Sequence, residues 1–218
     1  MTVRRKVAVL ISGRGSNMQS LVRACATPDY PAEIVLVLSN RADAAGLDFA
    51  REAGIATAVI SHKDFPDRAS FDAAMDAEIR RHGAELVCLA GFMRLLDARI
   101  IEAWRDRMIN IHPSLLPSFR GLDTHERALE AGVKLAGCSV HFVRPDVDTG
   151  PIIAQAAVPV LPGDTPDSLA ARILEQEHLI YPMALRLVAE GRVRVEGNRA
   201  IMDAPTTTIS LRNPDLVE

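Results

Sequence analysis

The feature that most limits the fold is an alternation of strand patterns and helix patterns along the first half of the chain. Apolar runs of strand length occupy residues 6–11, 33–38, 55–60 and 86–90. Segments with helical spacing follow them at residues 18–26, 47–53, 68–82 and 97–104. Parallel strands need long crossover connections, usually helices, whereas antiparallel strands can be joined by tight turns. The alternation therefore predicts an α/β fold, a doubly wound, mostly parallel open sheet of Rossmann-like form with helices on both faces.

The second half of the chain continues with strand-like runs and two helices. Strands are predicted at residues 108–111, 135–143 and 152–160, and a small hairpin at 193–196 and 199–202. A helix is predicted over residues 124–131 with Thr124 as its N-cap. A longer helix starts after Thr165, and Pro182 should kink it or end it early.

The length and composition of the chain favour one large domain. We expect a single domain over residues 1–200, with a phosphate-binding half to about residue 105 and a catalytic half from about residue 106, and a C-terminal tail, 203–218, of open role. The net charge of −3 argues against a nucleic-acid partner, because such surfaces are usually strongly basic. No apolar run is long enough for a membrane span, and the chain begins without a signal-peptide pattern, so we expect a cytoplasmic protein without a membrane partner, either a monomer or a homodimer.

The cysteines and the other potential ligands give no metal signature. Cys25, Cys88 and Cys138 are far apart and lie in or beside apolar segments, which favours a role as small buried side chains. No cluster of His, Cys and carboxylate residues has metal-ligand spacing, so the sequence predicts no metal.

A glycine loop follows the first strand. Residues 12–17 read Ser-Gly-Arg-Gly-Ser-Asn and stand between a buried strand and a helix, the arrangement in which backbone N–H groups bind phosphate. Met18 occupies the position of the third glycine of a dinucleotide fingerprint, and Arg41 follows the second strand where an NAD site needs an acidic residue. The loop therefore favours a monophosphate ligand, and an ordinary glycine turn is the alternative.

Asn110 and His112 are the strongest catalytic candidates. Pro113 cannot donate to a sheet ladder, so the strand should end at His112 and place both side chains at its carboxyl end, where ligands bind in open α/β sheets. An Asn amide can stabilise an oxyanion and a His can move a proton near neutral pH. The loop after residue 143 offers Asp146 and Asp148 to orient the imidazole. A structural histidine and a solvated acidic turn are the alternatives.

Two further features point to ligand contacts. The apolar loop after the fourth strand carries one cation, Arg94, and could line a flat aromatic site or only cap the core. Glu177 falls on the apolar stripe of the last long helix, four residues after Ile173, so its carboxylate faces inward and needs a partner. That partner is either a substrate amine or hydroxyl, or a nearby Arg in a buried ion pair.

Taken together, these motifs make the chain resemble the phosphoribosylglycinamide formyltransferases, folate-dependent enzymes of purine synthesis, to about residue 195. The segments that carry the resemblance are Ile11-Ser-Gly-Arg-Gly-Ser-Asn17, Leu89-Ala-Gly-Phe-Met-Arg94, Asn110-Ile-His-Pro-Ser-Leu-Leu-Pro117, Gly137-Cys-Ser-Val-His-Phe142, Asp148-Thr-Gly-Pro151 and Gln176-Glu-His178 with Tyr181-Pro182. The resemblance implies direct transfer of a formyl group from 10-formyltetrahydrofolate to the amine of phosphoribosylglycinamide.

The same resemblance assigns roles to individual residues. It implies that the catalytic residues are Asn110, His112 and Asp148. It implies that Gly15, Ser16 and Asn17 bind the substrate phosphate and that Glu177 binds the rest of that substrate. The folate contacts it implies are Arg68, Met93, Arg94, Leu95, Leu96, Asn110, Arg144, Pro145, Asp146, Val147 and Asp148. In this mechanism protonated His112 and Asn110 stabilise the oxyanion, and Asp148 raises the pKa of His112.

Other functions are compatible with parts of the pattern. Formyltetrahydrofolate deformylase uses the same trio to deliver water, although those enzymes usually carry a preceding regulatory domain. Methionyl-tRNA formyltransferase needs a further C-terminal domain and a basic surface. A non-catalytic folate- or nucleotide-binding module would need only the glycine loop that contains Gly15 and the apolar loop that contains Phe92. An NADP reductase would use Arg41 for the 2′-phosphate.

Overall fold

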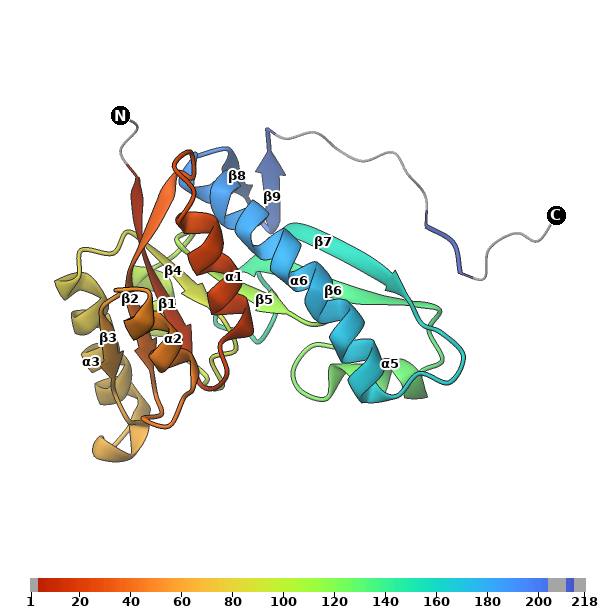
Figure 1. Cartoon of the computed structure of the whole chain (residues 1–218), viewed down its shortest axis with the longest axis horizontal. Coiled ribbons are helices and arrows are strands. Elements are labelled where there is room, and N and C mark those ends of the chain that lie inside the picture. Colours follow the sequence, from red (N-terminus) through yellow and green to blue (C-terminus); the bar gives the residue numbers. More distant parts are fainter. Residues whose placement is uncertain (1–3, 204–210, 214–218) are drawn as a thin grey trace.

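The central element is a seven-stranded sheet with the order β3-β2-β1-β4-β5-β6-β7. A computed structural model describes residues 4–203 and 211–213 of the chain (Figure 1). The strands are β1 Arg5–Ile11, β2 Ala32–Ser39, β3 Thr57–Val59, β4 Leu86–Leu89, β5 Met108–His112, β6 Leu135–Phe142 and β7 Ile152–Pro159. The first five strands pair in parallel, whereas β6 and β7 run antiparallel to their neighbours. The predicted mostly parallel sheet is confirmed.

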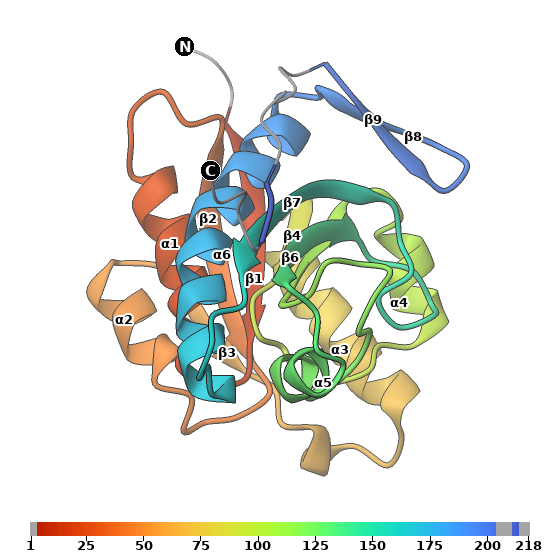
Figure 2. The same ribbon diagram turned by 90° about the vertical axis from the view of Figure 1, so that its right-hand side faces the viewer.

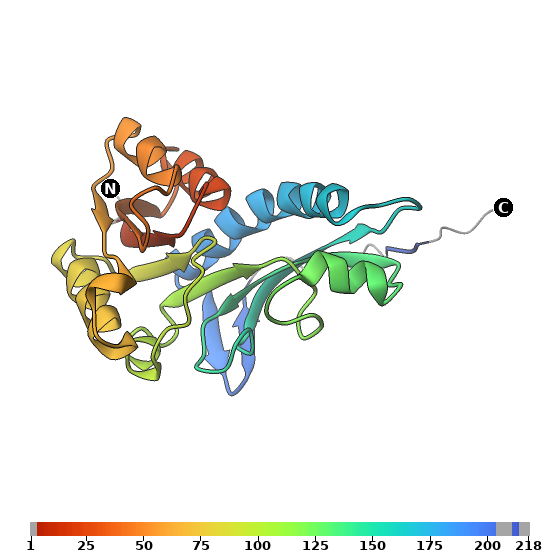
Figure 3. The same ribbon diagram turned by 90° about the horizontal axis from the view of Figure 1, so that it is seen from below.

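Helices cover both faces of this sheet, as predicted. The helices are α1 Ser16–Cys25, α2 Gly46–Glu52, α3 Arg68–Arg81, α4 Ala98–Ala103, α5 Thr124–Glu130 and α6 Pro166–Ala189, with a short 3₁₀ helix at His62–Asp64. Figure 2 shows α1, α2 and α6 on one side of the strands and α3 and α4 on the other. Figure 3 shows α6 running along the sheet, where it contacts α1, β6 and β7.

The two layers enclose two apolar clusters that follow the alternation of side chains along each strand. Val7, Val9 and Ile11 of β1 face the cluster beneath α1 and α6, whereas Ala8 and Leu10 face the cluster beneath α3 and α4. The three cysteines are free and buried, as predicted. Among the helices of the described residues, none is long and apolar enough to cross a membrane.

One detail of the helices differs from prediction, and one of two predicted alternatives is excluded. Thr124 is the first residue of α5, and Asp123 is the N-cap residue, without a side-chain capping bond. The longer helix does begin with a capping box at Thr165, but it does not end early at Pro182; it continues to Ala189. An internal proline costs roughly 3 kcal/mol. Burial of Tyr181, Ala184 and Leu185 on either side of it offsets that cost.

The chain after α6 forms the predicted hairpin, β8 Val193–Glu196 and β9 Arg199–Met202. Gly197 has a φ of 60° in the turn, a conformation that glycine adopts without a Cβ penalty. Strand β9 contacts β7, so the hairpin packs beside the main sheet. Most of the predicted tail lies outside the described residues; within it, the side-chain amide of Asn213 donates to the carbonyls of Lys134 and Val160.

Candidate active site

The loop after β1 presents the start of α1 to a cleft. Gly15 is the N-cap residue with a φ of 71°, and a Cβ there would lie 3.0 Å from Cε of Met18 and 3.2 Å from Cα of Gly46. Ser16 and Asn17 form the first turn, so the helix begins two residues before the predicted residue 18. The N–H groups of a first turn have no partner within the helix and carry the positive end of its dipole. This geometry suits the predicted phosphate position.

The cleft has a volume of about 810 Å³ and lies at the ends of the parallel strands. It brings together predicted residues from two loops: Gly15, Ser16 and Asn17 after β1, and Met93 and Arg94 after β4. Strands β1 and β4 are neighbours at the point where the strand order reverses, the usual ligand crevice of such sheets. Cationic side chains, among them Arg14, Lys63 and Arg94, also line the cleft, which favours an anionic ligand.

The catalytic candidates lie on β5, the strand beside β4, and do not line that cleft. Ile109 and Ile111 face the cluster beneath α6, so Asn110 and His112 point to the opposite face of the sheet. Asp148 reaches this face from the loop after β6. Its Oδ2 lies 3.3 Å from Nδ1 of His112, and the Asp148 side chain is 10% exposed. The structure therefore brings the three predicted residues together.

His112 has a partner at each ring nitrogen. Besides the contact of Nδ1 with Asp148, Nε2 donates to the carbonyl of Phe119 at 3.0 Å. The backbone N–H of Gly121 donates to Oδ2 of Asp148 at 2.9 Å. The loop of residues 113–121 thus contacts both members of the His–Asp pair, and sequence reasoning found neither of these backbone contacts.

His141 is a functional candidate that the sequence reasoning left without a role. It is buried in β6 directly opposite Asn110, whose amide Nδ2 lies 3.3 Å from Nε2 of His141. The same Nε2 lies 3.5 Å from Oδ1 of Asp148, and Nδ1 lies 3.0 Å from the carbonyl of Phe142. The signal that could have found it is a histidine inside an apolar strand, since a buried imidazole needs polar partners.

Two opposing effects act on the pKa of His112. Burial lowers this pKa from its ordinary value of 6.5; the Phe119 carbonyl and the Asp148 carboxylate raise it, but by less. The contribution of Asp148 to this pKa has the predicted sign, and burial outweighs it. Burial also raises the pKa of Asp148, but hydrogen bonds from His141 and Gly121 outweigh this and lower it below 3.8. At neutral pH the ligand-free site therefore holds Asp148 as a carboxylate facing Nδ1 of His112.

We expect the free energy of unfolding to fall as the pH drops below about 6.5. Burial lowers the pKa values of His112 and His125, so over this range the unfolded chain binds protons that the folded chain does not. The contribution of these two histidines to the free energy of unfolding is fully present above the pKa of the unfolded chain and is lost as the pH falls. Glu177 acts in the opposite direction, because burial raises its pKa from 4.5.

Urea unfolding of the wild type and of His125→Gln between about pH 7.5 and pH 5.5 separates these contributions. The variant keeps Glu177 and loses only one buried imidazole, so its stability should depend less steeply on pH. Equal slopes for the two proteins would mean that His125 titrates alike in the folded and unfolded chains.

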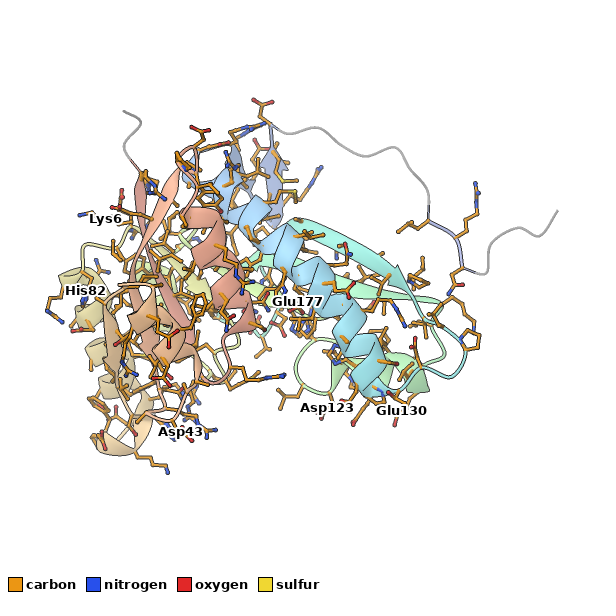
Figure 4. The ribbon with its side chains drawn as sticks, in the orientation of Figure 1. Lys6, Asp43, His82, Asp123, Glu130 and Glu177 are labelled. Atoms are coloured by element: carbon orange, nitrogen blue, oxygen red, sulfur yellow. The ribbon has the colours of Figure 1, made fainter. Side chains whose placement is uncertain are left out.

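Glu177 lies on α6 (Figure 4). Its side chain is buried, and its partner is an amide rather than an arginine. The side-chain Nδ2 of Asn17 donates to Oε2 of Glu177 at 2.6 Å. The alternative of a buried ion pair with Arg is therefore wrong. The Oδ1 atom of Asn17 is buried without a hydrogen-bond partner, so this Asn–Glu pair retains acceptor capacity that a donor group on a ligand could use.

The apolar side chains predicted to contact folate lie in two loops, one after β4 and one after β6. Met93 and Leu95 are 67% and 58% exposed, whereas Phe92 and Leu96 on either side pack against the cluster beneath α3. The loop after β4 thus caps the core and also presents two apolar side chains to solvent. Val147, in the loop after β6, is 46% exposed.

Of the predicted arginine contacts, Arg68 and Arg94 lie at the surface, whereas the side chain of Arg144 is 11% exposed. Arg68 begins α3, and it and Arg94 are exposed near the buried carboxyl of Asp72. Arg144 is already paired with Asp106 and donates to the carbonyl of Val143. Neighbouring Pro145 and Asp146 are exposed. Within residues 4–203 and 211–213, no group of three or more His, Cys, Asp or Glu side chains is arranged to hold a metal ion.

Residues 5–185 match the family model described as formyl transferase, and the chain belongs to that family. It is 45% identical over 197 residues to phosphoribosylglycinamide formyltransferase of Escherichia coli K12, covering 90% of this chain and 93% of that protein. The solved structure of glycinamide ribonucleotide transformylase 1 from Symbiobacterium toebii aligns with a TM-score of 0.90 at 50% identity, covering 91% of this chain and 94% of that one.

A third relative is larger. The chain is 53% identical over 196 residues to the trifunctional purine biosynthetic protein adenosine-3 of Bos taurus. That match covers 90% of this chain but 19% of the trifunctional protein, so the chain spans about a fifth of its length. The resemblance stated from the sequence motifs is confirmed.

Proposed function

We propose that this protein transfers the formyl group of 10-formyltetrahydrofolate to the amine of 5′-phosphoribosylglycinamide in purine biosynthesis. The observation that carries the proposal is the contact of Asp148 with His112, on the strand that also presents Asn110. The family match and the 45% identity to an enzyme with this name support it. We propose that the reaction takes place in the cytoplasm, in a monomer or homodimer without nucleic-acid or membrane partners.

The substrate sites follow from the cleft. We propose that the N–H groups of Gly15, Ser16 and Asn17 bind the phosphate and that Glu177 accepts a hydrogen bond from the rest of this substrate. The formyl donor lies against the exposed side chains of Met93 and Leu95 and reaches the face of β5. In this arrangement residues to about 105 supply the phosphate-binding half, and residues from about 106 to 200 supply the catalytic half.

In the proposed reaction the amine nitrogen attacks the formyl carbon while the carbonyl oxygen gains negative charge. The Nδ2–H of Asn110 and a ring N–H of His112 stabilise that oxyanion; each such donor is worth roughly 3 kcal/mol in the transition state. The bond from carbon to N10 then breaks, and the proton lost by the amine replaces the formyl group on N10. Asp148 relays this proton through water and stabilises the imidazolium form of His112.

The His112 contacts add one requirement. Because Nε2 donates to the Phe119 carbonyl in the ligand-free protein, this N–H must leave that carbonyl before it can bind the oxyanion. Phe119 belongs to the loop of residues 113–121, so release of this N–H requires that loop to move.

The test is loss of the formyl group from 10-formyltetrahydrofolate, followed with the purified protein in the presence and absence of phosphoribosylglycinamide. We expect loss only when the amine substrate is present. Loss without it would replace the transferase by a deformylase, and no loss in either case would leave a binding module.

A further inference from the structure

The serine that ends β1 connects three neighbouring strand ends. Ser12 follows β1, and its hydroxyl donates to Oδ1 of Asn40, which follows β2, at 2.6 Å. The same oxygen accepts from the backbone N–H of Met93, in the loop after β4, at 2.8 Å. Ser12 and Asn40 are 7% and 5% exposed, so water does not readily replace either bond.

The loop that Ser12 holds, residues 91–96, carries the exposed apolar side chains assigned above to the formyl donor. A second bond fixes its start, because the N–H of Ser12 donates to the carbonyl of Gly91 at 3.1 Å. Its far end is fixed by Asp72, whose carboxyl accepts from the N–H of Asp97. Between these anchors the side chains of Met93 and Leu95 are 67% and 58% exposed, so the backbone of the loop largely sets where they lie.

We infer that Ser12 is a positioning residue for the formyl donor, an inference that rests on the proposed function. Its hydroxyl holds the backbone N–H of Met93 and thereby fixes the position of the Met93 and Leu95 side chains that contact the donor. The phosphate side of the cleft is held by other contacts: Gly46 N–H donates to the carbonyl of Gly13, and Gln19 N–H donates to that of Gly15. Removing the Ser12 hydroxyl should therefore weaken binding of the formyl donor and leave binding of phosphoribosylglycinamide unchanged.

The first test needs no activity. Hydrogen exchange of the ligand-free protein should show the Met93 amide exchanging at least about fivefold faster in Ser12→Ala, because one hydrogen bond of about 1 kcal/mol is lost. Amides in the first turns of α1 should keep their wild-type rates. The matched control is Ser39→Ala, which removes a buried hydroxyl at the end of β2; among the described residues its partner is the N–H of Arg41.

The second test is kinetic. In Ser12→Ala we expect the KM for 10-formyltetrahydrofolate to rise about five- to tenfold, while kcat and the KM for phosphoribosylglycinamide change less than about twofold. Ser12→Thr keeps the hydroxyl and should restore the donor KM, and Ser39→Ala should leave it unchanged.

The outcomes separate the possibilities. An unchanged Met93 exchange rate in Ser12→Ala, an equal rise of both KM values, or the same split in Ser39→Ala would each overturn the positioning role. A wild-type protein without transferase activity would refute the proposed function, and the exchange experiment would still decide whether Ser12 holds the loop.

Discussion

Asp148→Asn is expected to lower kcat by roughly 10³-fold while leaving the affinity for the formyl donor within about threefold of wild type. The amide of Asn can still accept from the N–H of Gly121, so the loop keeps one of its anchors. It cannot stabilise the charge on a protonated His112, and its NH₂ group places a donor where the imidazole needs an acceptor. In a Ser-His-Asp triad the same change costs about 10⁴-fold in kcat.

The measurement is steady-state kinetics with both substrates, together with donor binding at equilibrium. Asp123→Asn is the matched control: Asp123 lies two residues after Gly121 on the exposed side of that loop (Figure 4). Its φ of 56° is one that Asn tolerates. Wild-type turnover in Asp148→Asn would remove Asp148 from the mechanism, and equal losses in the two variants would point to a general effect on the loop.

Gly150→Ala is expected to destabilise the fold by about 3 kcal/mol or more. A Cβ at this position would lie 1.6 Å from the carbonyl oxygen of Phe142 and 2.8 Å from its carbon. Both atoms are backbone, at the place where β6 and β7 begin to pair and Phe142 N–H donates to the carbonyl of Pro151. The strands must separate to admit the methyl group, and Asp148, two residues earlier, should move away from His112.

Urea unfolding at neutral pH measures this loss, with Gly13→Ala as the control. Gly13 has no atom within 4 Å of an added Cβ and no left-handed φ, so its variant should stay within about 1 kcal/mol of wild type. Wild-type stability in Gly150→Ala would mean that the two strands do not approach this closely at residue 150.

Local signals predicted most of the secondary structure. The strand that ends at His112 was found because Pro113 cannot continue a ladder, and the hairpin at 193–202 because Gly197 allows its turn. The errors occur where tertiary packing outweighs a local rule. Pro182 does not end α6, because the residues around it are buried against the sheet.

The site divides in the same way. Asn110, His112, Asp148 and Glu177 were each candidates from residue type and position alone, because each sits at a strand end, in a loop or on an apolar stripe. The contacts among them were not predictable. His141 meets Asn110 only because β6 runs antiparallel beside β5, and Glu177 meets Asn17 only because α6 packs on α1.

The sequence by itself determined the order of strands and helices, the mostly parallel sheet and the types of residue available for catalysis. These follow from hydrophobic periodicity and turn chemistry, which act over a few residues. The tertiary structure alone decided that Ser12 ties the loop after β4 to β2, and that burial lowers the pKa of His112. Hydrogen bonds between distant segments and the burial of a charge depend on how the layers pack, and no local pattern encodes that packing.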